Sequence, residues 1–163
     1  EICGLKWEDF DEVAGTLKVC RTVYQETGGG LTAGDTKTSA GTRKIVLPAS
    51  TVRVLGERKK FALTEWIFPN PLKPEQPTNP GSAYRRLKVL LKQAGLPNIR
   101  FRDLRHTFAT LTLQNGVDIK TVSSMLGHYD AGFTLRTYTH ATRQMQDRAA
   151  ETMANILSDV AGC

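Results

Sequence analysis

Residues that bind metals or form disulfides are scarce in this sequence. Its 163 residues include three cysteines and three histidines, and Cys3, Cys20 and Cys163 share no metal-ligand spacing. An odd number of cysteines without such spacing is typical of reduced thiols in a cytosolic protein and argues against a structural zinc site. No apolar run approaches the length of a membrane span, and no signal peptide precedes a cleavage site. We therefore expect a cytoplasmic protein that does not enter a membrane.

The composition is that of a folded chain. Hydrophobic residues make up 40% of it and charged residues 23%, which excludes a disordered tail or a coiled coil. A length of 163 residues favours one domain, with enough core to need no disulfide or metal. The chain opens on Glu1 without a methionine, in a segment typical of the end of a helix, so we expect a fragment of a longer protein.

Positive charge exceeds negative charge and is unevenly spread. Lys and Arg number 22 against 16 for Asp and Glu, which gives a net charge of +6. Residues 37–60 hold seven bases and one acid, and so do residues 85–105. This excess favours a polyanionic partner, most simply nucleic acid, although a solvated basic surface would have the same composition.

The first half of the chain predicts a small antiparallel sheet. Residues 16–25 alternate apolar and polar side chains, which is typical of a half-buried strand. A glycine-rich turn follows over 27–35, and residues 43–47 predict a returning strand that Pro48 ends. Five of the seven prolines fall within 69–80, which predicts an exposed connection.

The second half predicts helices, because apolar residues recur there at helical spacing and glycines follow several of the runs. Asp103 and Asp118 are expected to cap two of them. The predicted helices cover residues 84–94, 103–116, 118–127, 133–139 and 143–160. In the second of these, the expected apolar side holds Leu104, Phe108, Leu111 and Leu113. The fold class that we expect is α+β, mostly helical, with a small antiparallel β-sheet.

Two arginines lie three positions apart at the start of a predicted helix. Arg102 and Arg105 would share one face of that helix, where two guanidiniums beside a helix N-terminus can bind a phosphate. The alternative is a pair of surface arginines. His128 follows the glycine that ends the next helix. It is either a functional hydrogen-bond donor or a histidine placed against the helix dipole.

Tyr138 and Lys37 are candidates of a different kind. A tyrosine hydroxyl has an ordinary pKa of about 10, so Tyr138 would act as a nucleophile only with cations around it, and would otherwise pack in a core. Lys37 lies in the turn between the predicted strands, where it would either donate a proton or only solvate the loop. Taken singly, these residues leave both alternatives open.

The order of these motifs along the chain resembles the tyrosine recombinases, also called the phage integrase family. A turn lysine precedes an arginine box, a Leu-Gly-His box and a tyrosine ten residues after that histidine. The motifs lie at residues 4–9, 37–43, 104–110, 126–128 and 137–140. The resemblance covers nearly the whole chain and is greatest to integrases of conjugative transposons and temperate phages.

The resemblance implies a reaction and a role for each residue. Tyr138 would attack the scissile phosphate of DNA, form a 3′-phosphotyrosyl bond and release a 5′-hydroxyl. Arg105 would stabilise charge on the non-bridging oxygens, and His128 would donate a hydrogen bond to the same phosphate. Lys37 would protonate the leaving 5′-oxygen. The family needs no metal or other cofactor, because the covalent link keeps the phosphodiester energy.

Two features depart from the family pattern. The position of Arg102 is usually a histidine, and an arginine can hold a phosphate but cannot act as a base at neutral pH. The first catalytic arginine of the family is expected just before Glu1, together with N-terminal DNA-binding domains. We therefore expect residues 1–163 to be a single, N-terminally truncated catalytic domain that is inactive, or nearly so, by itself.

Double-stranded DNA and further copies of the chain are the partners that the resemblance implies. The family works as a tetramer on DNA, and the apolar stripe over 145–160 would pack either within the chain or onto a neighbouring subunit. The expected DNA contacts are Arg43, Lys44, Arg85, Arg86, Arg100 and His106. Contacts of this kind go mostly to backbone phosphate, so binding should weaken with salt.

Three other functions fit parts of the sequence. A type IB topoisomerase also cleaves DNA with a tyrosine, although the short length of the chain and the Leu-Gly-His box favour a recombinase. A non-catalytic DNA-binding module with a relict site would accommodate Arg102 and the expected absence of the first arginine. A basic domain that binds protein or RNA is the third.

Overall fold

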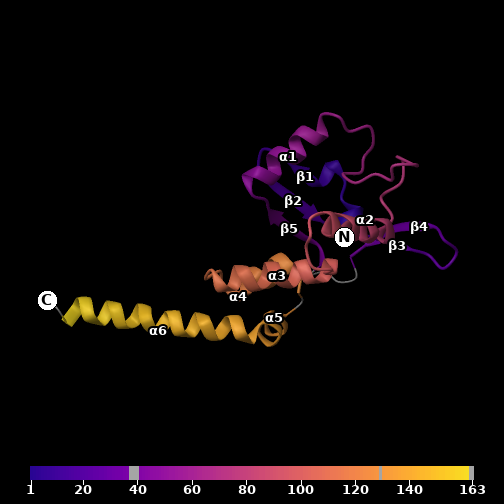
Figure 1. The fold of residues 1–163 in the computed structure, drawn as a ribbon. Helices are drawn as coiled ribbons and strands as arrows, with labels where there is room; N and C mark the ends of the chain where they lie inside the picture. Colours follow the sequence, from indigo (N-terminus) through magenta and orange to yellow (C-terminus); the bar gives the residue numbers. More distant parts are fainter. Residues whose placement is uncertain (37–40, 129, 162–163) are drawn as a thin grey trace. The chain divides into compact units, whose positions relative to one another are not determined.

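The fold is known from a computed structural model, which describes residues 1–36, 41–128 and 130–161 (Figure 1). The chain divides into two compact units, Glu1–Phe101 and Arg102–Cys163. The first unit holds all the described strands, and the second is helical. The expected fold class, a mostly helical α+β fold with small antiparallel sheets, is confirmed.

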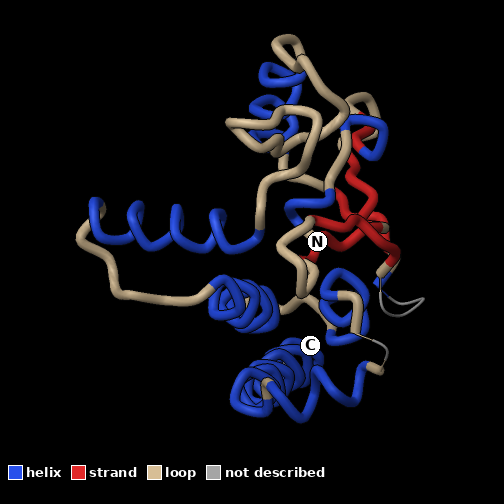
Figure 2. The backbone as a smooth tube through the Cα atoms, turned by 90° about the vertical axis from the view of Figure 1, so that its right-hand side faces the viewer, coloured by secondary structure: helices blue, strands red, loops and turns tan. Residues whose placement is uncertain are grey.

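The strands of the first unit, red in Figure 2, belong to two small antiparallel sheets. One sheet has the order β1-β2-β5 and the other pairs β3 with β4. Their bounds are Phe10–Asp11 for β1, Thr16–Val19 for β2, Arg21–Gln25 for β3, Leu31–Asp35 for β4 and Arg43–Val46 for β5. Leu17 lies opposite Ile45 in the first sheet, and Val23 lies opposite Ala33 in the second.

The prediction of one strand over residues 16–25 was wrong. The chain leaves the first sheet at Cys20 and enters the second at Arg21, so β2 and β3 pair with different partners. Leu17, Val19 and Val23 are all buried, as the alternation predicted. The period of two continues through the break, and the alternation therefore carries no sign of the change of sheet.

The core of the first unit lies between the three-stranded sheet and helix α1, Ala49–Lys59. Five buried side chains form it: Leu5, Phe10, Leu17, Val19 and Ile67. Val52 and Leu55 of α1 pack against this cluster. The chain start forms two short 3-10 helices, η1 (Ile2–Gly4) and η2 (Trp7–Asp9), and the Ile67 N–H donates to the Leu5 carbonyl at 2.9 Å.

The proline-rich stretch was predicted to be exposed, and it is exposed over residues 71–76, half-buried at its two ends and buried at Pro77. Figure 2 draws the residues before helix α2 as loop. Helix α2 spans Pro80–Gln93. Asn79 caps it by accepting a 2.7 Å hydrogen bond from the Gly81 N–H, and proline at the first helical position fits the geometry of a helix start.

Four helices form the second unit: α3 (Phe101–Gln114), α4 (Ile119–Leu126), α5 (Ala131–Thr137) and α6 (Thr139–Ala161). Asp118 caps α4 as predicted, accepting a 2.9 Å bond from the Thr121 N–H. Asp103 does not cap α3. That helix begins two residues earlier, which places Asp103 in its first turn. A carboxylate there still interacts favourably with the positive end of the helix dipole.

The core of the second unit consists of Ala109, Leu113, Val122, Leu126 and Tyr138. The predicted apolar side of α3 is correct only for Leu113, because Leu104, Phe108 and Leu111 are exposed. Ala109 and Leu113 are one helical turn apart, and their side of α3 packs against α4 and Tyr138. Within the described ranges, no helix combines the length and the hydropathy that crossing a bilayer requires.

Candidate active site

Tyr138 lies at the junction of α5 and α6, where it is the C-terminal cap residue of α5. Its N–H donates to the Thr134 carbonyl at 3.0 Å, and the residue is 7% exposed. The ring belongs to the core, while the hydroxyl oxygen lies 2.9 Å from Nδ1 of His106. The sequence left a packing role and a chemical role for Tyr138 as alternatives. In the structure its ring packs in the core while its hydroxyl makes a polar contact, so the two roles are compatible.

Opposing effects act on the ionisation of Tyr138. Burial raises the pKa of its hydroxyl above the usual value, because a phenolate loses hydration in the core. The positive charges of Arg105 and Arg102 act to lower the same pKa, and burial is the larger effect. The hydroxyl therefore stays protonated at neutral pH and sits where two cations favour its ionised form.

Arg105 joins α3 to the end of α4. Its Nη2 donates a hydrogen bond to the carbonyl of Leu126, the last residue of α4, and its side chain is half-buried. Arg102 is exposed in the first turn of α3, three residues earlier. The shared face that their spacing predicted is consistent with the action of both charges on the Tyr138 hydroxyl.

His128 leaves α4 through a left-handed glycine, as predicted. Gly127 has φ of 68°, a conformation that costs other residues steric strain. The Nδ1 atom of His128 lies 2.7 Å from the hydroxyl oxygen of Thr134, which is completely buried in α5. The ring of Phe133 meets the His128 ring edge-on, with centroids 4.8 Å apart. Neighbours on α5 thus orient this imidazole.

Lys37 lies outside the described residues, in the connection between β4 and β5. The ends of that connection are held together, because the hydroxyl oxygens of Thr36 and Thr42 are 2.9 Å apart. Its expected role in catalysis stays a prediction.

Arg43, an expected DNA contact, forms a two-pronged ion pair with Glu1. The Nη1–Oε1 distance is 3.0 Å and the Nη2–Oε2 distance is 2.9 Å, and the Arg43 side chain is only 11% exposed. A phosphate would have to compete with this carboxylate for the guanidinium. The two residues are 42 positions apart, so sequence spacing offered no sign of the pair.

The other expected DNA contacts of the first unit, Lys44, Arg85, Arg86 and Arg100, are exposed. His106 belongs to the second unit and is half-buried against the Tyr138 hydroxyl. The sequence had assigned His106 to DNA and missed this contact. Adjacent helix residues point in different directions, and no local rule links positions 106 and 138.

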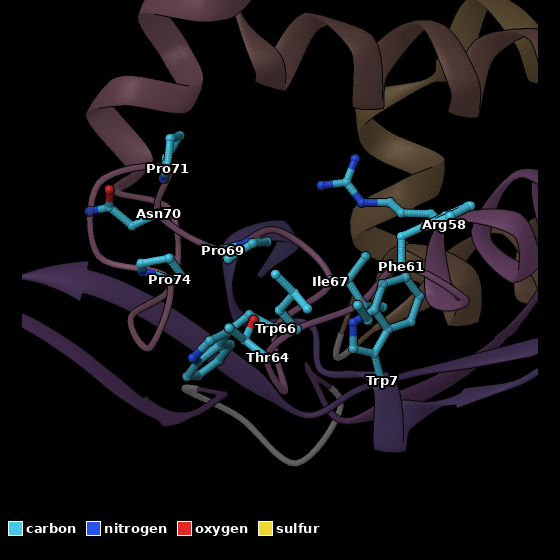
Figure 3. Close-up of a pocket in the computed structure, with 12 residues that line it drawn as sticks. Trp7, Arg58, Phe61, Thr64, Trp66, Ile67, Pro69, Asn70, Pro71 and Pro74 are labelled. Atoms are coloured by element: carbon cyan, nitrogen blue, oxygen red, sulfur yellow. The ribbon is translucent and has the colours of Figure 1, made fainter.

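A pocket of about 390 Å³ opens in the first unit, and the residues found to line it include none of the candidate site residues (Figure 3). Pro71 and Pro74 lie on one side of it, and Trp7, Phe61 and Arg58 on the other. Among the twelve described residues that line it, Arg58 carries the only charge. The pocket therefore offers apolar surface rather than groups for acid–base chemistry.

Comparisons with known proteins agree on one family. The family model described as "Phage integrase family" matches residues 1–145. The chain is 28% identical to a tyrosine recombinase XerC-like protein of Caldanaerobacter subterraneus subsp. tengcongensis, over 96% of the chain and 45% of that protein. It is 30% identical to an integrase of Saccharopolyspora erythraea, over 79% of the chain and 32% of that protein. The chain thus spans less than half the length of these relatives.

Solved structures show the same fold. The Tn1549 transposon integrase in complex with transposon right end DNA matches with a TM-score of 0.76 at 22% identity, over 91% of this chain and 53% of that chain. The XerA recombinase matches with a TM-score of 0.68 at 26% identity, over 91% of this chain and 52% of that chain.

Proposed function

Because the chain belongs to the phage integrase family, we propose that it is the catalytic part of a site-specific DNA recombinase. The observation that carries this proposal is the convergence at Tyr138 of a core-held tyrosine hydroxyl with the charges of Arg102 and Arg105. Phosphoryl transfer mainly requires a positioned nucleophile and cations around the equatorial oxygens, and this arrangement supplies both.

In the proposed reaction, the Tyr138 oxygen attacks phosphorus and the bond from phosphorus to the 5′-oxygen breaks. This forms a 3′-phosphotyrosyl link, and Lys37 protonates the leaving oxygen. Arg105 and His128 bind the non-bridging oxygens, with His128 oriented by its contact with Thr134. Arg102 adds a further positive charge to the phosphate site, where it replaces the usual histidine of the family. The residues require no metal for any of these steps.

Duplex DNA is the proposed substrate, and the exposed lysine and arginine side chains of the first unit are its proposed contacts. Lys44, Arg85, Arg86 and Arg100 can neutralise backbone phosphates without reading the sequence. The ion pair with Glu1 makes Arg43 a weaker candidate than these four. Integration or excision of a mobile element, in the compartment that holds the DNA, is the biological role that we propose.

We also propose that α6 binds a second copy of the chain. Three apolar residues of this helix, Met153, Ile156 and Leu157, are each more than half exposed. Ile156 and Leu157 lie three and four positions after Met153, so the three share one side of the helix. In the resemblance, the segment after the nucleophile packs onto a neighbouring subunit of a tetramer, and an uncovered apolar side supports that arrangement.

Covalent trapping on nicked DNA that carries the crossover site tests the proposal. We expect the full-length protein to form a protein–DNA adduct that withstands denaturation, and Tyr138→Phe to form none. This chain by itself should form little adduct if a further arginine precedes Glu1. Salt-sensitive binding without any adduct would instead indicate a DNA-binding module with a relict site. Relaxation of supercoiled DNA without a partner site would indicate a topoisomerase, and binding that ignores salt would indicate a protein or RNA partner.

A further inference from the structure

We propose that His106 is the catalytic residue that accepts the proton of Tyr138, a role that Arg102 cannot perform. The inference rests on the proposed function, since it concerns the activation of the same nucleophile. In this chain Arg102 occupies the position where the family usually has a histidine, and an arginine cannot act as a base. The proposal assigns that step to another residue of α3.

The contact is direct. The Nδ1 atom of His106 lies 2.9 Å from the Tyr138 hydroxyl oxygen, within the range that proton transfer requires. The two rings are tilted by 55° with centroids 5.8 Å apart, so they meet through these polar atoms rather than through stacked faces. In the tautomer that carries its hydrogen on Nε2, His106 accepts the hydroxyl proton at Nδ1.

The other charged groups around the hydroxyl cannot take this proton. Arg102 and Arg105, both on α3, are the charges that act on Tyr138, and guanidiniums stay protonated at neutral pH. His128, which follows α4, has its Nδ1 committed to the hydroxyl of Thr134. Among the described residues, His106 is the one whose imidazole nitrogen, an atom that can accept a proton, is in hydrogen-bond contact with the Tyr138 hydroxyl.

The proton must move because burial keeps the Tyr138 hydroxyl protonated. Its pKa is raised by loss of hydration, so a phenolate does not form in advance. As the Tyr138 oxygen bonds to phosphorus, its proton passes to Nδ1 of His106, and the two arginines stabilise the negative charge that develops. The 5′-oxygen leaves with a proton from the general acid. In the reverse step a 5′-hydroxyl attacks, and the imidazolium returns its proton to the departing tyrosine oxygen.

The test compares two kinds of substitution in the full-length protein. His106→Asn keeps a hydrogen-bond acceptor near the position of Nδ1 but cannot be protonated, whereas His106→Ala removes the ring. Thr107→Asn, at the exposed neighbouring position, is the matched control. The rate of adduct formation on nicked crossover-site DNA is measured across pH, with DNA affinity and melting temperature measured in parallel.

We expect His106→Asn to slow adduct formation by roughly 10²- to 10⁴-fold, the usual range for loss of a general base. DNA affinity should not change, and the fall in rate toward acid pH that protonation of the base causes should disappear. Added imidazole should restore part of the rate to His106→Ala, and more basic imidazoles should restore more. Thr107→Asn should behave as the wild type.

Two results would overturn the inference and leave the proposed function intact. One is an unchanged rate in His106→Asn, which would mean that the ring only holds Tyr138 in place. The other is a His106→Ala protein that forms adduct slowly, still loses rate toward acid pH, and gains no rate from added imidazole. Absence of any adduct from the wild type would instead overturn the proposed function, and this inference with it.

Discussion

At the scale of single residues, the ionisation of Tyr138 reports the balance between burial and nearby charge. Since its pKa is raised in the folded chain, we expect the phenol to titrate above about 10, and Arg105→Gln to move the titration higher still. The folded form keeps this proton where the unfolded form has lost it. The free energy of unfolding should therefore fall as the pH rises through that range.

Ultraviolet difference titration of the wild type against Tyr138→Phe isolates this tyrosine from the other three. The fall in unfolding free energy at high pH should be smaller in Tyr138→Phe, because the shifted group is gone. A phenol that titrates at or below its ordinary pKa would contradict the burial of Tyr138.

Thr134 tests the orientation of His128. Within the described part of the chain, the hydroxyl of this completely buried residue has one hydrogen-bond partner, Nδ1 of His128 at 2.7 Å, so Thr134→Val removes a hydrogen bond with little change in shape. We expect a loss of about 1–3 kcal/mol in the free energy of unfolding by urea. Thr137→Val in the same helix is the control, because its exposed hydroxyl bonds the Phe133 carbonyl. It should stay within about 0.5 kcal/mol of the wild type, and equal losses would argue against a role for the His128 contact.

At the scale of elements, the end of α4 determines where His128 is held. Gly127→Ala forces a side chain into the left-handed conformation and should cost roughly 1 kcal/mol. Gly116, after α3, has φ of 88° and open space around it, so Gly116→Ala should cost a similar amount. Only Gly127→Ala should also slow adduct formation. Urea unfolding and covalent trapping separate the two effects, and equal effects on trapping would show that stability alone matters.

The exposed apolar side of α6 makes a separate prediction. Ile156→Asp places a charge where we propose contact with a second copy, so it should weaken assembly of the full-length protein on paired DNA sites. Asn155→Asp adds the same charge at the adjacent exposed position and should assemble normally. Sedimentation of the protein–DNA complex measures the stoichiometry. Unchanged assembly in Ile156→Asp would mean that this side of α6 packs elsewhere.

At the scale of the whole molecule, positive charge should govern DNA affinity. Lys44→Gln and Arg85→Gln should each weaken binding similarly on all sequences and reduce the slope of log K against log salt by about 0.9. Lys73→Gln, in the proline-rich connection outside both basic segments, should leave the slope unchanged. Fluorescence anisotropy across salt concentrations gives these slopes. A salt slope that no basic substitution alters would contradict phosphate contacts at these positions.

Much of the architecture followed from local patterns. Glycine after an apolar run predicted the end of α4, and Asp118 predicted its start, because caps act within one turn of a helix. The burial of Leu17, Val19 and Val23 followed from the period of a strand. The motif order predicted the family, because those residue types at those spacings are specific in combination.

Contacts between distant residues were decided only by the tertiary structure. The Arg43–Glu1 ion pair joins positions 42 apart, and the contact between His106 and Tyr138 joins positions 32 apart. Periodicity describes which side of one element is apolar, but it holds no information on which other element that side meets. The sequence by itself thus determined the family and the helical second half of the chain, and it predicted Tyr138 as the nucleophile. The neighbour of the Tyr138 hydroxyl depended on how α3 and the α5–α6 junction pack around a shared core.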